Sequence, residues 1–358
     1  MTTTMTTFAL SLTPLDLLFF RDGRPFDAAA RVRSGLPQPQ TVAGAVRTWL
    51  LANAGCDFDR LGNDIKAGIS FAHACAGQGP KIANVSTARF RGPWFSRDGK
   101  TPILPMPATL RRRKDDKNHH QLIRLDPLAK PPPGWRSENG LLPLWYRGHE
   151  TIEPVGGYLT SEGVAKFLAG GVPETQHCVN AAELYAEDRR SSVAISPRQF
   201  TAAPGQIFSV GFLALKPGVS LLIEVDLVGD EEIPGEGVIR LGGEGRQAHL
   251  RRLSAPIIWP RADAGEAQRI FLLTTPSVFP GGWKPAALSP LAAAVPAPIA
   301  VSGWDLARGG PKPTRFAVPA GAVYYVKDTA STAEDLFQHD QDSASGSAHA
   351  LEGVWNYA

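Results

Sequence analysis

Two β-rich runs joined by a proline- and glycine-containing turn constrain the fold more than any other part of the chain. They form RRSSVAISPRQFTAAPGQIFSVGFLAL at residues 189–215, and this pattern predicts a β-hairpin. A further apolar run, VSLLIEVDL at residues 219–227, predicts a strand directly after it. Strands that follow one another without helices pair antiparallel, so the chain does not have the βαβ alternation of a parallel sheet.

Other parts of the chain also carry signals for strands and for a helix. FALSLTPLDLLFF at residues 8–20 predicts a first strand broken at Pro14, because proline cannot donate to a strand ladder. TVAGAVRTWLLANAG predicts a helix with Thr41 as N-cap and Gly55 at its end. The 36 glycines and 31 prolines favour many short strands over a helical bundle. We therefore predict an α+β protein with antiparallel sheets, and its later strands are expected within residues 237–253, 267–279 and 321–328.

A chain of 358 residues is long enough for two domains of ordinary size. The apolar pattern is lost between about residues 77 and 171, where basic and proline-rich stretches alternate with aromatic residues. We interpret this segment as a long basic insertion in the first domain. SAPIIWPRADAGEA at residues 254–267 has the composition of a joint. The expected domains are therefore residues 1–255 and a smaller domain, residues 256–358, with an acidic tail.

Charge is distributed unevenly although the net charge is only +3. Residues 81–124 contain eleven Lys or Arg against three Asp, whereas residues 328–358 contain six carboxylates and no Lys or Arg. The basic segment predicts a surface suited to a polyanion. The three cysteines lack CxxC spacing, which argues against disulfides and zinc. Without a signal peptide or a membrane-spanning run, we expect a cytoplasmic protein that does not enter a membrane.

The glycine-rich stretch does not have the spacing of a known cofactor-binding motif. GGEGR at residues 242–246 lacks the GxGxxG spacing of a dinucleotide site, and no Gly-Lys-Ser/Thr follows as in a P-loop. Either a glycine turn that a phosphate can approach or a tight hairpin without a ligand remains. His119 and His120 lie beside Asp115 and Asp116, but the arginines at 111–113 would repel a cation. We expect a solvated loop there, no metal and no cofactor.

Two basic stretches leave alternatives open. LLFFRDGRPF at residues 17–26 places Arg21 and Arg24 around a glycine turn, which suits an active-site turn, a phosphate cradle or a surface hairpin. ARFRGPWFSR at residues 88–97 alternates arginines with aromatic residues. It could stack on unpaired bases, or pin the insertion to the core through Trp94 and Phe95. Because no convincing base or nucleophile accompanies them, the catalytic interpretation is the weakest.

Four stretches match, in order, the motifs of one protein family. They are LTPLDLLFFRDGRPF (12–26), PQPQTVAGAVRTWLL (37–51), DRRSSVAISPRQFTAAPGQIFSVGFL (188–213) and IRLGGEGRQAHL (239–250). They resemble an opening strand with an Arg-Asp-Gly turn, a first helix, a basic hairpin and a glycine-rich loop. The ordered set resembles the RAMP superfamily of CRISPR effector complexes, and specifically the third-subunit family of the type III-B (Cmr) complex.

The resemblance implies two RRM-like, ferredoxin-like β-α-β-β-α-β domains. It also implies a subunit without catalysis of its own that holds the 5′ handle of the crRNA. The implied protein partners are the large polymerase-like subunit and the neighbouring RAMP backbone subunit. The residues expected to meet RNA are Arg21, Arg24, Arg31, Arg33, Thr41, Gly44, Arg47, Arg189, Arg190, Gly242, Gly243, Gly245 and Arg246.

Two alternatives belong to other functional classes. Some RAMP relatives cut RNA, so the chain could be a metal-independent endoribonuclease that processes precursor crRNA. Its candidate base would be His249, with Arg251 and Arg252 stabilising the charge on the phosphorane. The basic segment could instead bind an acidic protein partner, with RNA contact incidental.

Overall fold

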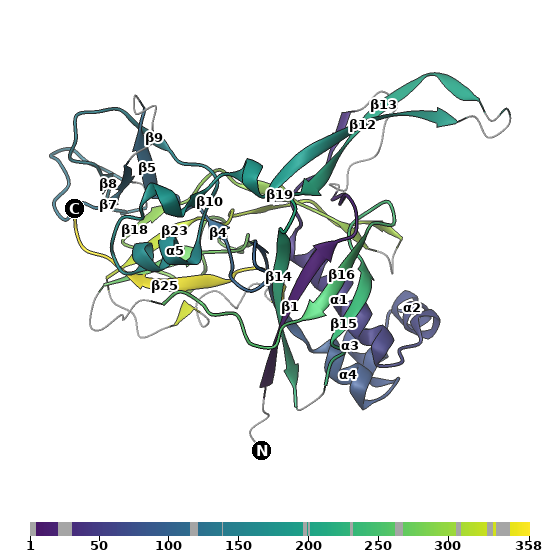
Figure 1. Ribbon diagram of the computed structural model, residues 1–358. Coiled ribbons are helices and arrows are strands. Elements are labelled where there is room, and N and C mark those ends of the chain that lie inside the picture. Colours follow the sequence, from purple (N-terminus) through teal and green to yellow (C-terminus); the bar gives the residue numbers. More distant parts are fainter. Residues whose placement is uncertain are drawn as a thin grey trace. The chain divides into compact units, whose positions relative to one another are not determined.

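The chain divides into two compact units that each combine distant segments (Figure 1). Unit 1 contains residues 1–93, 184–256 and 300–315, and unit 2 contains residues 94–183, 257–299 and 316–358. The domain limits expected from the sequence stay a prediction. The computed structural model describes residues 5–20, 31–114, 121–137, 139–195, 199, 201–229, 232–261, 268–305, 309–327, 332–333 and 344–358.

The main sheet of unit 1 has the strand order β15-β16-β1-β14-β3. Strand β1 pairs antiparallel with both β14 and β16, so the first strand of the chain lies in the middle of the sheet. Strand β14 carries the VSLLIEVDL run, and its residues from Ser220 to Leu227 are all buried. The strands are β1 (Met5–Pro14), β3 (Arg89–Ser96), β14 (Ser220–Val228), β15 (Glu236–Arg240) and β16 (Gln247–Arg252).

Helix α1 (Pro39–Asn53) packs against this sheet, where Trp49 lies next to Gly237 of β15. The predicted N-cap was wrong, because the helix begins two residues before Thr41. Pro39 occupies the first turn, where its missing N–H costs nothing, and Gln38 is the N-cap residue. Gly55 follows the helix with φ 81°, as expected of a C-terminal glycine. The next helices are α2 (Phe58–Lys66), α3 (Phe71–Ala76) and α4 (Pro80–Ser86).

The predicted hairpin is confirmed as β12 (Tyr185–Ile195) and β13 (Ala202–Leu215). Strand β2 (Arg31–Arg33) pairs with β13 in parallel and completes a three-stranded sheet of order β12-β13-β2. Figure 1 shows the two long strands of this hairpin extending away from the main sheet of unit 1. We call β2, β13 and β12 the hairpin sheet.

Unit 2 is built around a four-stranded sheet of order β18-β23-β17-β25. Phe271, Leu273 and Tyr324 are fully buried in its core, and Trp355 donates from Nε1 to the Val326 carbonyl at 3.0 Å. Helix α5 (Ser161–Leu168) packs against β25. The strands of this sheet are β17 (Arg269–Leu273), β18 (Ala292–Ala294), β23 (Val323–Val326) and β25 (Ala350–Val354).

Apart from β3, the strands within residues 77–171 have two to four residues, too few for an alternating pattern to show in the sequence. The expected solvated loop at 111–113 was wrong, since these arginines lie on β5 between β6 and β9; His119 and His120 are outside the described residues. The remaining elements are β4 (Leu104–Pro105), β5 (Leu110–Arg113), β6 (Leu122–Arg124), β7 (Asp126–Pro127), β8 (Leu144–Trp145), β9 (Ile152–Pro154), β10 (Tyr158–Leu159), η1 (Thr175–His177), β11 (Cys178–Val179), η2 (Ala181–Glu183), β19 (Ile299–Val301), β20 (Trp304–Asp305), β21 (Gly310–Pro311), β22 (Arg315–Ala317) and β24 (Ser345–Gly346).

The aromatic and basic stretch at residues 88–97 proves to be part of the core. Phe90, Trp94 and Phe95 are all buried, so their rings are not available to stack on bases. Arg91 donates from Nε to Glu224 at 2.8 Å and from Nη2 to Asp226 at 3.0 Å. Burial alone would lower the pKa of Arg91, but its bonds to these two carboxylates raise it instead.

The structure confirms a mixed α+β protein with mostly antiparallel sheets, and β2 with β13 is a parallel pair. The RRM-like arrangement expected from the resemblance stays a prediction. Among the described residues, no helix is both long and apolar enough to cross a membrane.

Candidate nucleic-acid interface

The glycine-rich loop joins β15 to β16 and rests on the segment that follows β1. Gly242 and Gly245 have φ values of 86° and 64°, a conformation that favours glycine. A Cβ atom at Gly242 would come within 2.5 Å of the Phe19 carbonyl oxygen. The Gly243 N–H donates to that same oxygen at 2.7 Å. The glycines therefore let the loop backbone dock on Phe19.

Arg246 closes this loop and points its guanidinium at the hairpin sheet. Its Cζ lies 4.6 Å from the centre of the Phe212 ring, and Nη1 donates to Asp16 at 2.5 Å. Arg190 approaches the same ring at 5.6 Å, and the Phe19 ring centre lies 5.3 Å from that of Phe212. Three segments far apart in the sequence thus meet at one ring. We call Phe19, Arg190, Phe212 and Arg246 the Phe212 cluster.

The other face of the hairpin sheet carries a second pair of arginines. Gly211 is the register partner of both Arg189 on β12 and Arg33 on β2. Side chains alternate between the faces of a strand, so Arg189 lies on the face opposite to Arg190. Glu187 forms ion pairs with Arg189 at 3.1 Å and with Arg33 at 3.6 Å.

The described arginine side chains of the hairpin sheet are paired but exposed, whereas the Arg246 side chain is only 19% exposed. Arg190 pairs with Asp188 at 3.4 Å, and its side chain is 51% exposed. Ion pairs at this exposure contribute only about 0–1 kcal/mol, so a better anion can replace the carboxylate. Guanidinium groups bind phosphate oxygens through two parallel hydrogen bonds. This part of unit 1 can therefore hold a phosphate backbone.

The predicted residues on α1 have other surroundings. The Arg47 guanidinium lies 4.7 Å from the centre of the Phe90 ring and donates to the Ala88 carbonyl at 3.4 Å. Its burial lowers the pKa of Arg47. Thr41 is half-buried, and the space beside Gly44 is open. None of the contacts described for these three residues involves the glycine-rich loop or the hairpin sheet.

Three further arginines, Arg21, Arg24 and Arg31, were predicted to meet RNA. Arg21 and Arg24 lie outside the described residues, as does the side chain of Arg31, whose backbone pairs with Ser209. A hydrogen bond joins the described residues on either side of residues 21–30, since the Phe20 N–H donates to Ser34 Oγ at 2.9 Å.

The groups suggested for RNA cleavage are brought together only in part, because Arg251 lies on the same face of β16 as His249 and Arg252 lies on the opposite face. His249 Nε2 lies 3.6 Å from Glu236 Oε2 on the neighbouring strand. Arg252 points to the opposite face of β16, where its Cζ lies 5.1 Å from the centre of the Phe8 ring. Arg252 is therefore not placed to assist His249.

The sequence analysis missed Phe212, Glu187 and Gly211. The alternation of β12 and β13 would have placed Phe212 and Arg190 on one face and Gly211 and Arg189 on the other. The contact of Arg246 with Phe212 joins segments more than thirty positions apart, and no local pattern predicts it.

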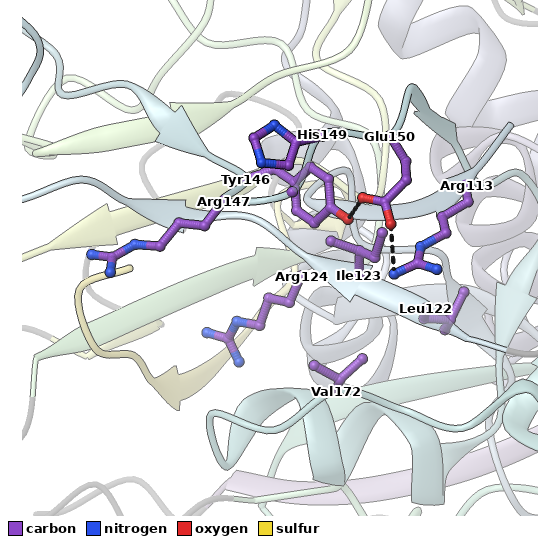
Figure 2. A pocket seen from close by; sticks show the side chains of 10 residues that line it. Arg113, Leu122, Ile123, Arg124, Tyr146, Arg147, His149, Glu150 and Val172 are labelled. Carbon is purple, nitrogen blue, oxygen red and sulfur yellow. Dashed lines mark hydrogen bonds and ion pairs between the residues drawn. The ribbon is translucent and has the colours of Figure 1, made fainter.

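Unit 2 has an open pocket of about 720 Å³ (Figure 2). Within it, Tyr146 donates to Glu150 at 2.8 Å, and Arg113 forms an ion pair with Glu150 at 3.1 Å. The bond from Tyr146, and then the charge of Arg113, keep the pKa of Glu150 below its usual range. Arg124 is buried and donates to the Phe167 carbonyl at 2.7 Å. Glu150 is thus paired within the pocket, and within the described ranges no group of three potential metal ligands occurs.

Comparisons with known proteins bear on the whole chain. A solved type III-B Cmr-beta complex bound to cognate target RNA and AMPPnP contains a chain of similar fold, with a TM-score of 0.50 and 15% identity over 88% of this chain and 86% of that one. A second structure, of Cmr-beta bound to cognate target RNA, gives a TM-score of 0.49 and 14% identity over the same shares. No curated protein sequence matches the chain.

The fold therefore places the chain among mixed α+β proteins with mostly antiparallel sheets. A chain of a type III-B effector complex has a similar fold. The family model described as CRISPR-associated protein (Cas_Cmr3) matches residues 10–355, nearly the whole chain. The chain belongs to this family and is a subunit of a type III-B CRISPR complex.

Proposed function

We propose that this subunit holds the 5′ handle of the crRNA and acts as a scaffold without catalysis of its own. The observation that carries the proposal is the convergence of the glycine-rich loop, the end of the first strand segment and the hairpin sheet on Phe212. Backbone N–H groups and guanidiniums can there face one sugar-phosphate chain.

The partners follow from the same proposal. The complex that contains the chain of similar fold is bound to target RNA, so we include RNA and neighbouring subunits of the complex among the partners of this chain. The large polymerase-like subunit and the adjacent RAMP backbone subunit are the expected protein neighbours.

A binding assay with a fluorescent RNA that carries the 5′ handle tests the proposal. Replacing Arg190 and Arg246 by glutamate should weaken binding at least about tenfold, because two phosphate contacts are lost and two repulsive charges gained. Arg97 is the matched control, since its side chain is 47% exposed and pairs with Glu183 in unit 2. Arg97→Glu should leave the affinity nearly unchanged. Equal affinity of the double variant and the unmodified protein would contradict the proposal.

Cleavage of the RNA is the second readout. The scaffold proposal expects the handle RNA to stay intact during long incubation with the purified protein. Metal-independent cleavage that disappears in His249→Ala would favour an endoribonuclease instead.

A further inference from the structure

Arg33, Gly211 and Arg189 lie in one row across the hairpin sheet. The missing side chain of Gly211 leaves a gap between the two guanidiniums. Gly211 pairs with Arg189 in the antiparallel ladder and with Arg33 in the parallel one, so the three positions share a face. The side chains of Arg33 and Arg189 are 66% and 61% exposed. Because Gly211 has no side chain, two exposed cations flank a bare stretch of backbone.

The carboxylate of Glu187 fills this gap. Glu187 precedes Arg189 by two residues and lies on the same face of β12. Its Oε1 accepts from Arg189 Nε at 3.1 Å and its Oε2 from Arg189 Nη2 at 3.2 Å. Arg33 Nε lies 3.6 Å from Oε1. A Cβ atom at Gly211 would overlap the carboxylate, so the carboxylate lies directly above the glycine backbone.

A phosphodiester can take the place of this carboxylate. Both groups present two anionic oxygens that a guanidinium binds through parallel hydrogen bonds. The hydrogen bonds from Arg189, and then its charge, lower the pKa of Glu187, so the carboxylate is ionised at neutral pH. It therefore competes with any other anion for the two arginines. The competition is mild, because the ion pairs are solvent-exposed.

We propose that the space above Gly211 is a phosphate subsite, which Glu187 occupies when no nucleic acid is bound and vacates when a phosphodiester enters. The ligand class is the backbone of single-stranded RNA, so the inference rests on the proposed function. Glu187 then acts as an intramolecular competitor that weakens RNA binding. The Phe212 cluster lies on the opposite face of the hairpin sheet, so RNA held at both sites passes around the edge strand β12 and gains enough contacts to displace Glu187.

The variant Glu187→Gln tests this subsite in the handle-RNA binding assay. It removes the competing charge and keeps the size of the side chain. Affinity should increase about 2- to 5-fold at low salt, the equivalent of one surface ion pair no longer broken. Glu183→Gln is the matched control, because it makes the same change of charge and frees an exposed arginine, Arg97, in unit 2. The control should bind RNA as the unmodified protein does.

A phosphate titration gives a readout that does not depend on RNA. In protein labelled with ¹⁵N-arginine, inorganic phosphate should shift the side-chain signals of Arg33 and Arg189 at lower concentration in Glu187→Gln than in the unmodified protein. Signals of Arg97 should respond equally in both. Retention of the native amide spectrum would confirm that the variant is folded.

The outcomes separate the two proposals. If Glu187→Gln binds RNA no more tightly than Glu183→Gln, or more weakly, Glu187 does not occupy a phosphate subsite and the inference is overturned. If the unmodified protein does not bind handle RNA, the proposed function fails. A selective phosphate response of Arg33 and Arg189 would in that case still support the subsite, and its absence would overturn it.

Discussion

Arg91 is a cation that pairs with two buried carboxylates of unit 1. Glu224 is 3% exposed and Asp226 is 8% exposed, and Arg91 from β3 forms ion pairs with both. Buried carboxylates of this kind need a cation because the protein interior does not replace their hydration. The sequence left open whether the stretch that contains Arg91 contacts unpaired bases or anchors the insertion to the core, and in the structure Arg91 has a structural function.

Replacing Arg91 by methionine should lower the free energy of unfolding by about 3–5 kcal/mol, since two buried carboxylates lose their cation. Urea denaturation followed by circular dichroism measures this loss. Arg97→Met, which breaks an exposed ion pair with Glu183, should cost no more than about 1 kcal/mol. Similar losses in the two variants would contradict the structural function of Arg91.

The carboxylate of Asp98 stabilises a turn through several hydrogen bonds. Its Oδ1 accepts from the N–H groups of Lys100 at 2.8 Å and Thr101 at 2.7 Å, and Ser96 Oγ donates to it at 2.8 Å. Burial alone would raise its pKa, but these bonds outweigh burial and lower the pKa of Asp98 to about 2. The charged form is thus the one that stabilises the turn.

The pH dependence of Asp98→Asn follows from this direction. A carboxyl whose pKa is lower in the folded state stabilises the protein above its unfolded pKa and loses that contribution as the pH falls toward about 2. The variant should be less stable than the unmodified protein by about 1 kcal/mol at pH 7, a small loss because the side chain is exposed to solvent. Thermal unfolding at pH 7 and at pH 2.5 should show the difference shrinking. A difference that grows at low pH would contradict this origin.

The glycine-rich loop is the element whose backbone matters most to the candidate interface. Gly242 combines a φ of 86° with close approach to the Phe19 carbonyl, whereas Gly245 has a φ of 64° and open space around it. The two positions share the conformational requirement and differ in the contact. They therefore form a matched pair for substitution.

Gly242→Ala should lower the affinity for handle RNA at least about fivefold, because the loop must move away from Phe19 and takes Arg246 with it. Gly245→Ala should cost about 1 kcal/mol of stability from its positive φ and lower RNA affinity less than Gly242→Ala, because a Cβ atom there meets no atom of the protein within 4 Å. Anisotropy titrations and urea denaturation of both variants measure these effects. Equal affinities would show that docking on Phe19 does not position Arg246.

The elements of this chain differ in how far the sequence predicts them. The hairpin and β14 were predicted because long alternating or apolar runs identify strands. The N-cap of α1 was placed three residues late, at Thr41 instead of Gln38, because Pro39 at the first turn replaces a side-chain cap. The sequence does not reveal that Ala88 and Phe90 receive the guanidinium of Arg47, and the assignment of Arg47 to RNA stays a prediction. Contacts between distant segments decide such functions, and local patterns do not contain them.

At the scale of the whole molecule, RNA binding should depend strongly on salt. If Arg33, Arg189, Arg190 and Arg246 each meet one phosphate, the logarithm of the binding constant should fall with the logarithm of salt concentration at a slope of about −3. Replacing Arg190 and Arg246 by alanine should reduce the slope to about half. Titrations at salt concentrations from about 50 to about 300 mM measure this slope. A slope near zero would exclude phosphate contact as the main source of affinity.

The central position of β1 has a consequence for synthesis. Leu12 pairs with Leu221, more than two hundred positions later, so the first strand leaves the ribosome long before its partner exists. At about 5–20 residues per second, the nascent chain exposes this apolar strand for roughly 10 to 40 seconds. Chaperones that shield hydrophobic segments have that interval in which to act, and translation that stalls before β14 should yield a product prone to aggregation.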